Sequence, residues 1–145
     1  IIYNETLRDR VCAVSNKTRY NEMNVISMHA LIGAYQQQGY EWLDELNEVI
    51  EGNVDYFCNY VDKHFAGVSY SRPQGTYMVF LDCTEWCREH GRDIQWLLDE
   101  GARVGVGYQD GRPFHGPCHI RVNLALPLSR VQEACERLNH YVFNA

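Results

Sequence analysis

Residues 42–61 read WLDELNEVIEGNVDYFCNYV, and this stretch carries the clearest secondary-structure pattern of the chain. Its apolar residues recur about every 3.6 positions for about six turns, which predicts one long amphipathic helix. They are Trp42, Leu43, Leu46, Val49, Ile50, Val54, Phe57, Cys58 and Val61. The acidic residues lie mostly off this stripe and are expected to face water. Such a helix is long for a chain of 145 residues and often connects two domains.

The composition of the chain is that of a globular protein with its own core, with 46% hydrophobic and 22% charged residues. A net charge of −6 and a pI near 5.4 argue against a nucleic-acid surface. No apolar run approaches the roughly 20 residues of a membrane helix. The six cysteines lack the C-x2-C spacing of structural zinc sites. We therefore expect a cytoplasmic protein with free thiols, no metal site, and neither nucleic-acid nor membrane partners.

The first residues, Ile1-Ile2-Tyr3, are apolar from the outset, which suggests a cut through a strand and hence a fragment of a longer protein. Helices are predicted at 4–14 and 25–35. We expect residues 1–36 to be a remnant of a large domain with a linker. Residues 37–145 would form a C-terminal small domain that includes the long connecting helix.

The second half of the chain alternates predicted strands and helices. Strands are predicted at 68–70, 76–82, 103–106 and 118–124. Between them lie a tight turn at 72–75, a helix at 94–100 ended by Gly101, and a glycine-rich loop at 108–117. Ser129 is predicted to cap a final helix, with Gln132 in a capping box. Its buried stripe would be Val131, Cys135, Leu138 and Val142. The expected fold is α/β, of the α+β kind, with a small mixed or antiparallel sheet covered by helices.

The run from His119 to Pro127 sets Arg121 inside an apolar, strand-forming segment. A buried guanidinium needs an anionic partner, because an unpaired buried charge is costly and arginine does not lose its proton. Its N–H donors match two carboxylate oxygens, so Arg121 could hold the α-carboxylate of an amino acid. Two alternatives stay open. Arg121 could pair with one of the chain's nineteen acidic residues, or lie on an edge strand with its head in water.

Four segments, in order, resemble the C-terminal portion of pyridoxal-phosphate-dependent enzymes of the aspartate aminotransferase fold. Within that fold they are similar to the branch of cystathionine β-lyases and related aminotransferases. The segments are Gly39-Tyr40-Glu41-Trp42-Leu43, Pro73-Gln74-Gly75-Thr76-Tyr77 leading to Asp82, the loop 105–116, and Arg121-Val122-Asn123 followed by Ala125 and Pro127.

This resemblance implies that Arg121 binds the substrate α-carboxylate and so orients the bond that breaks at the α-carbon. Gly75 would allow close backbone approach at the substrate site, although a plain turn glycine explains it as well. The intact enzyme would be a homodimer that uses pyridoxal phosphate. In the family, the lysine that binds the cofactor lies upstream in a Ser-x-x-Lys motif. Lys17 and Lys63, the only lysines here, are expected at the surface, so the fragment alone should be inactive.

Other functions remain to be weighed. The parent could be an aminotransferase or a carbon–sulfur β-lyase, and this half of the enzyme does not separate them. A stand-alone domain could hold a small carboxylate without chemistry. Cys83, Cys87 and His90 could form a metal or redox cluster, but buried or idle thiols beside a surface histidine are the simpler interpretation because no fourth ligand is evident.

Overall fold

The computed structural model describes residues 2–19 and 22–144. Its contacts divide the chain into two compact units, Ile1–Asp44 and Glu45–Ala145, which are described separately. The predicted division between residues 36 and 37 stays a prediction. The strand expected at the start is not formed by Ile2 or Tyr3, and Ile1 lies outside the described residues.

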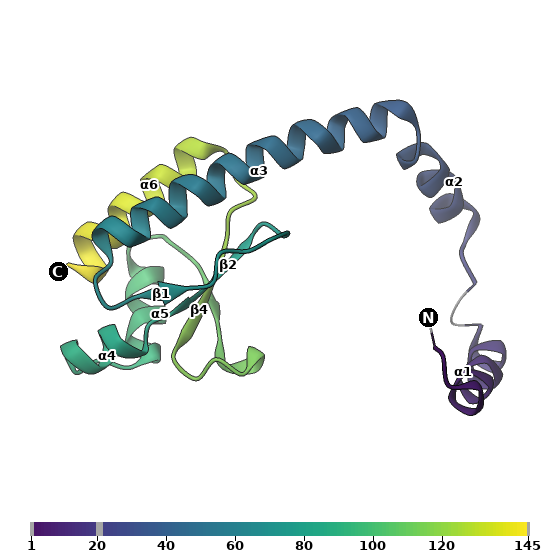
Figure 1. The fold of residues 1–145 in the computed structure, drawn as a ribbon, viewed down its shortest axis with the longest axis horizontal. Helices are drawn as coiled ribbons and strands as arrows, with labels where there is room; N and C mark the ends of the chain where they lie inside the picture. Colours follow the sequence, from purple (N-terminus) through teal and green to yellow (C-terminus); the bar gives the residue numbers. More distant parts are fainter. Residues whose placement is uncertain (1, 20–21, 145) are drawn as a thin grey trace. The chain divides into compact units, whose positions relative to one another are not determined.

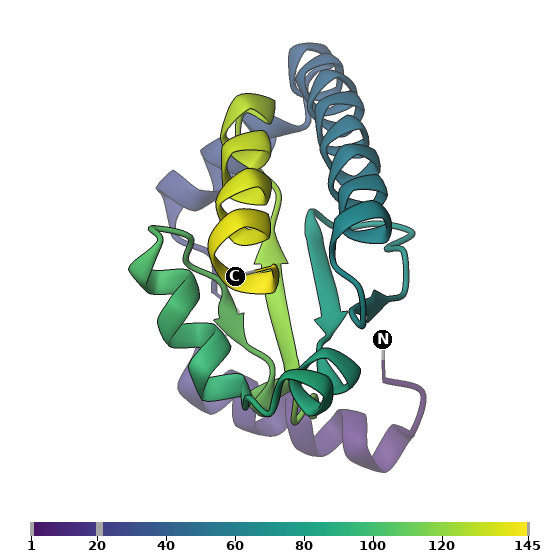
Figure 2. The ribbon, with the colours of Figure 1, turned by 90° about the vertical axis from the view of Figure 1, so that its left-hand side faces the viewer.

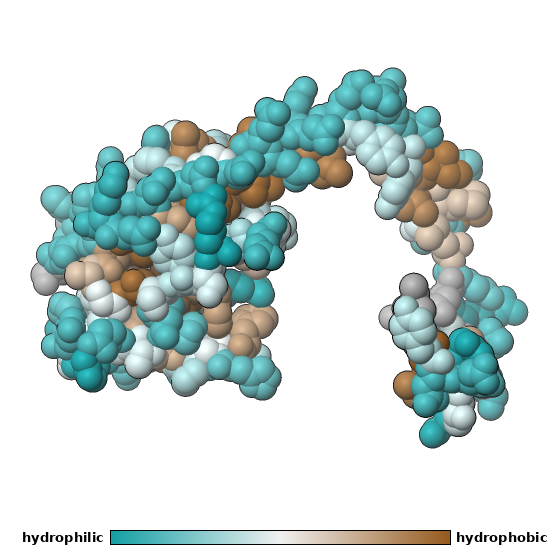
Figure 3. Space-filling view, in the orientation of Figure 1, coloured by the Kyte–Doolittle hydropathy of each residue, from teal (hydrophilic) through white to brown (hydrophobic). Residues whose placement is uncertain are grey.

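The first unit is built from exposed helices. Helix α1 spans Glu5–Thr18, a turn beyond its predicted end, and α2 spans Val25–Ala34. Asn4 and Asn24 cap them, since each side chain accepts a backbone N–H of the first turn. Neither helix has a buried residue, and the apolar side chains of α2 form one of the brown areas in Figure 3.

The long helix α3 spans Gln37–His64 and confirms the periodicity argument (Figure 1). It begins five residues before Trp42. Its buried residues lie in the second half and are Asn53, Val54, Phe57, Cys58 and Val61. No helix in the described part of the chain is both long and apolar enough to cross a membrane.

The second unit contains a small antiparallel sheet, as expected, but one of its four strands, Gln109–Asp110, lies within the predicted loop 108–117. Its strands are β1 (Ser69–Tyr70), β2 (Met78–Asp82), β3 (Gln109–Asp110) and β4 (His119–Asn123). Their order is β1-β2-β4-β3, so β2 and β4 form the centre. On these two strands Val79, Leu81, Ile120 and Val122 point inward and are buried. The residues between them point to the other face.

The described α-helices of the unit Glu45–Ala145 cover the inward face of this sheet. In Figure 2, α5 (Ile94–Arg103, green) and α6 (Leu128–Leu138, yellow) lie in front of the strands, with α3 beside them. The short helix α4 (Thr84–His90) adds Trp86 and Cys87 to the same core. Within the unit Glu45–Ala145, no described α-helix covers the outward face, against which only the 3-10 turn Arg112–Phe114 lies through Phe114.

The strand predicted at 103–106 is wrong. Helix α5 continues through Gly101 and ends at Arg103, and Gly105, two residues later, has a φ of 76° that suits glycine. The N–H groups of Gly105 and Val106 return to the carbonyls of Ala102 and Gly101, a glycine-terminated helix end. Gly101 serves packing instead, because a Cβ there would lie 2.5 Å from the Tyr108 ring.

The predicted Ser129 cap is also wrong. Helix α6 begins at Leu128, so Ser129 lies in its first turn. The carbonyl of Pro127 accepts the N–H groups of Arg130 and Val131, and no side chain caps the helix. The predicted stripe is confirmed: Val131, Cys135 and Leu138 are buried in α6, and Val142 is buried in the π-helical turn Asn139–Phe143 that follows.

Candidate functional site

Arg121 lies in the middle of β4 and points to the uncovered face of the sheet. Its strand neighbours are Phe80 on β2 and Gln109 on β3. The Nε–H of Arg121 donates to the Oε1 of Gln109 at 2.6 Å, and Nη2 donates to the same oxygen. The guanidinium carbon lies 4.0 Å from the centre of the Phe114 ring, a cation–π distance. One neutral amide and one aromatic ring therefore hold the half-buried Arg121 in place.

The described structure gives Arg121 no acidic partner. Among the residues that the structure describes, Arg121 forms no ion pair, and its Nη1 forms no hydrogen bond. Gln109 brings no charge, so the positive charge of Arg121 is not compensated at this position. The Nη1 and Nη2 edge of the guanidinium remains suited to a bidentate carboxylate.

The loop between β3 and β4 places Phe114 against Arg121. Phe114 ends the 3-10 turn Arg112–Phe114. A Cβ on Gly111 would lie 2.4 Å from the carbonyl oxygen of His119, and one on Gly116 would lie 2.5 Å from the Phe80 ring. Only glycine fits such close approaches, so these two residues set the path of the loop.

His119 and Asp82 continue the outward face at the far end of β2 and β4. The Nε2 of His119 lies 3.8 Å from an Asp82 oxygen, and its ring centre lies 4.6 Å from that of Phe80. Burial raises the pKa of Asp82, but hydrogen bonds from Thr84 and the nearby His119 outweigh it and place the pKa below its usual value. The carboxylate therefore stays ionised at neutral pH.

A buried asparagine that the sequence argument missed anchors the end of β4. Asn53 lies on α3, is 2% exposed, and donates to the carbonyls of Leu124 and Leu126 at 2.9 and 2.8 Å. Asn123 accepts the N–H of Ala125 at 2.8 Å, which turns the chain after the strand. The available signal was a polar residue within the apolar stripe of α3.

Gly75, the second predicted site residue, does not lie with Arg121. It lines a separate groove of about 790 Å³ between α3 and the turn before β2. Gly75 is exposed, and a Cβ there would meet nothing within 4 Å. The unusual backbone belongs to the next residue, because Thr76 has a φ of 96° and a branched Cβ. Such strain typically costs about 1–3 kcal/mol.

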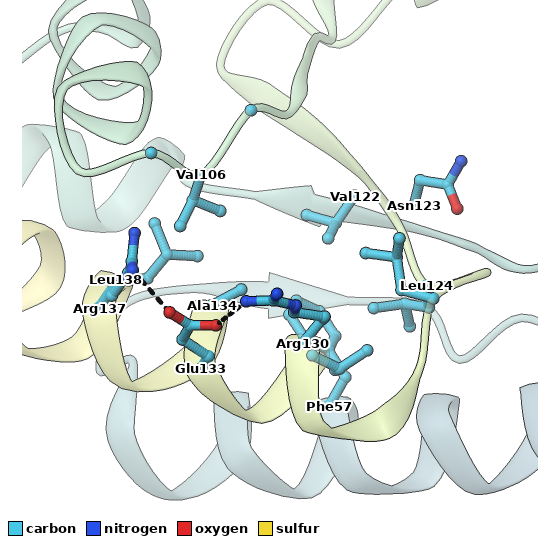
Figure 4. A pocket seen from close by; sticks show the side chains of 14 residues that line it. Phe57, Val106, Val122, Asn123, Leu124, Arg130, Glu133, Ala134, Arg137 and Leu138 are labelled. Carbon is cyan, nitrogen blue, oxygen red and sulfur yellow. Dashed lines mark hydrogen bonds and ion pairs between the residues drawn. The ribbon is translucent and has the colours of Figure 1, made fainter.

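A second hollow lies on the helix-covered side of the sheet (Figure 4). It measures about 400 Å³, and its apolar wall includes Phe57, Val122 and Leu124. On its rim Glu133 accepts hydrogen bonds from both Arg130 and Arg137, at 2.8 and 2.6 Å. Both of these arginines thus have an acidic partner, whereas Arg121 has none among the described residues.

The cysteines and lysines do not form a reaction centre in the described structure. Cys83 and Cys87 are buried, and burial is the main reason that the pKa of Cys87 rises to about 12. His90 turns away to the Trp86 carbonyl at 2.9 Å. Within the described ranges, no group of three His, Cys, Asp or Glu residues could hold a metal ion. Lys17 and Lys63 are exposed, as expected.

Comparison with known proteins gives a consistent set of matches. Residues 3–138 match the family model "Aminotransferase class I and II". A Mycobacterium leprae protein named "Putative cystathionine beta-lyase" is 34% identical over 122 residues, which cover 73% of this chain and 29% of that protein. The chain thus spans less than a third of the length of that relative.

Two solved structures share the fold. The pyridoxal-phosphate-bound C-S lyase of Staphylococcus hominis superposes with a TM-score of 0.80 at 22% identity, over 99% of this chain and 37% of that one. Cystalysin of Treponema denticola, which contains pyridoxal 5'-phosphate, gives 0.77 at 25% identity, over 98% and 36%. The antiparallel sheet and its helices therefore have the fold of pyridoxal-phosphate-dependent transferases.

Proposed function

The chain belongs to the aminotransferase class I and II family, and from that premise we propose that it is the C-terminal part of a pyridoxal-phosphate-dependent enzyme acting on amino acids. The names of the relatives favour a carbon–sulfur β-lyase, and the family description makes an aminotransferase the second candidate. The complete enzyme would be a cytoplasmic homodimer. Residues 1–36 would be the end of its large domain, and 37–145 its small domain.

One observation carries the proposed role of Arg121, namely its uncompensated charge on the uncovered sheet face. The guanidinium is held by Gln109 and Phe114, both neutral, and keeps a free edge of N–H donors. A carboxylate would supply the missing charge and accept two hydrogen bonds. The ligand proposed for this edge is the α-carboxylate of the substrate.

The proposed contribution of this chain to the reaction is binding and orientation. Bound pyridoxal phosphate supplies an electron sink for the electron pair left at the α-carbon. Arg121 would hold the carboxylate and thereby limit how the α-carbon can rotate, which selects the bond that reacts. Gly75 would offer backbone, free of a side chain, to the substrate or to a neighbouring domain.

The residues of this chain do not fit the attachment of the cofactor. A lysine that binds pyridoxal phosphate covalently needs a desolvated setting, whereas Lys17 and Lys63 are exposed. We therefore propose that the lysine and the phosphate-binding residues belong to the large domain, and that the present chain is inactive alone. A stand-alone domain that binds small carboxylates is the alternative, and it needs no such partner.

Replacing Arg121 in the complete holoenzyme tests this proposal. Arg121→Ala should lower kcat/KM for amino acids by roughly 30-fold to several thousandfold, because loss of one partner of a desolvated charge pair costs about 2–5 kcal/mol. The absorbance of the bound cofactor should stay unchanged. Arg130→Ala is the matched control, since that arginine is exposed and paired with Glu133. An unchanged kcat/KM in Arg121→Ala would refute the carboxylate role.

A further inference from the structure

We infer that Gln109 and Phe114 are positioning residues that decide which edge of Arg121 receives the substrate carboxylate. The inference rests on the carboxylate role proposed for Arg121. Neither residue was singled out by the sequence, because both fall in a stretch that reads as a loop. The contacts of the folded chain bring them to the guanidinium.

Gln109 occupies one of the two edges at which a guanidinium can bind a carboxylate with two hydrogen bonds. These are the Nε and Nη2 edge and the Nη1 and Nη2 edge. Both donors of the first edge point to the Oε1 of Gln109. A carboxylate is therefore received at the second edge, in line with the long axis of the Arg121 side chain.

Phe114 restrains the guanidinium, whose carbon lies over the Phe114 ring at 4.0 Å from its centre. The ring itself is held by the short turn, in which the N–H of Phe114 donates to the Gly111 carbonyl at 2.8 Å. The N–H of Gly111 in turn donates to the carbonyl of His119 on β4, also at 2.8 Å. The same strand thus carries Arg121 and anchors the loop that orients it.

The neutral amide at position 109 matters as much as its geometry. A glutamate of the same length would reach the same N–H groups and compensate the charge of Arg121. It would then compete with the substrate carboxylate. Glutamine restrains the guanidinium and leaves its full positive charge to the ligand.

A matched pair of competitive inhibitors separates positioning from general damage in the complete holoenzyme. L-alanine and ethylamine both carry an amine for the active site, but only L-alanine carries a carboxylate. Gln109→Ala and Phe114→Leu should each weaken the binding of L-alanine by about tenfold and leave the binding of ethylamine unchanged. Gln109→Glu should weaken the binding of L-alanine by about 100-fold. Phe114→Tyr keeps the aromatic ring and, unlike Phe114→Leu, should leave the binding of L-alanine unchanged.

The controls separate a failure of the proposed function from a failure of the positioning role. Gln132→Ala, on α6, should change neither inhibitor, and circular dichroism should confirm that every variant is folded. If Arg121→Ala leaves the preference for L-alanine over ethylamine intact, the proposed function itself is wrong. The positioning role alone is overturned if Arg121→Ala removes that preference while the Gln109 and Phe114 variants keep it. It is also overturned if those variants weaken the binding of both inhibitors equally.

Discussion

Ile120 and Arg121 are neighbours on β4, yet they belong to opposite faces of one sheet. Ile120 is fully buried beneath the helices, and Arg121 points to the uncovered face. Since successive side chains of a strand alternate between faces, one short segment contributes both to the core and to the candidate site. Stability and binding can therefore be changed separately by substitutions one residue apart.

The largest effect expected from this contrast is on folding. Ile120→Ala should lower the free energy of unfolding by about 2–5 kcal/mol, because it leaves a cavity in the core. Arg121→Ala should change it by less than about 1 kcal/mol, since Arg121 has no ion partner among the described residues. Urea denaturation of the chain measures both. An equal loss of unfolding free energy in the two variants would show that Arg121 is a structural residue like Ile120.

Arg121→Lys sharpens the functional side of the comparison. Lysine keeps the charge but loses the planar donors that match a carboxylate. In the complete holoenzyme, kcat/KM for amino acids should fall by about 100-fold, less than in Arg121→Ala. Steady-state kinetics at one pH provide the measurement. A lysine variant as active as the parent would mean that charge alone suffices.

Asn53 tests whether the end of β4 depends on the helix-covered side. Asn53→Ala should cost about 2 kcal/mol of unfolding free energy, because the carbonyls of Leu124 and Leu126 lose their donor and the first of these bonds is buried. Asn59→Ala, an exposed change on the same helix, is the control. Thermal unfolding followed by circular dichroism would report both. Equal melting temperatures for the two variants would show that the anchor contributes nothing.

The smallest effect concerns Asp82 at the edge of the outward face. Its folded-state pKa lies below the usual value, so its contribution to stability is present above the unfolded pKa and is lost as pH falls through the folded pKa. Because the carboxylate is partly exposed, the contribution should stay below about 1 kcal/mol. Asp82→Asn should flatten the acidic limb of the stability curve measured by urea titration at several pH values. A curve that keeps its full slope would assign the dependence to other carboxylates.

The sequence predicted the elements whose signal is local and repeated. The periodicity of α3 and the stripe of α6 each span several turns, and both are confirmed. The strand expected at 103–106 failed because apolar residues near Gly101 fit a helix end equally well, and Gly105 decides between them. The Ser129 cap failed because the first N–H groups of α6 donate to the Pro127 carbonyl, and no sequence pattern indicates that backbone contact.

The candidate site divides in the same way. Arg121 was recognisable because a charge inside an apolar run is unusual and because its neighbours resemble a known motif. Its partners were not recognisable, since Gln109 and Phe114 become neighbours of Arg121 only when β3 pairs with β4 and the loop folds back. Asn53 was hidden for the same reason, because its two acceptors lie more than 70 residues away along the chain.

The two close-packed glycines of the β3–β4 loop have a consequence for how recognition can diversify among relatives. Gly111 and Gly116 tie the loop to His119 and Phe80, so its length and path are fixed together with the strand. The guanidinium of Arg121 and both side chains that contact it come from residues 109–121. Residues 109–121 should therefore be exchangeable between relatives as one segment. A chimera that receives the whole segment should bind carboxylates with the geometry of the relative that supplied it, whereas a chimera joined inside the loop should lose that geometry.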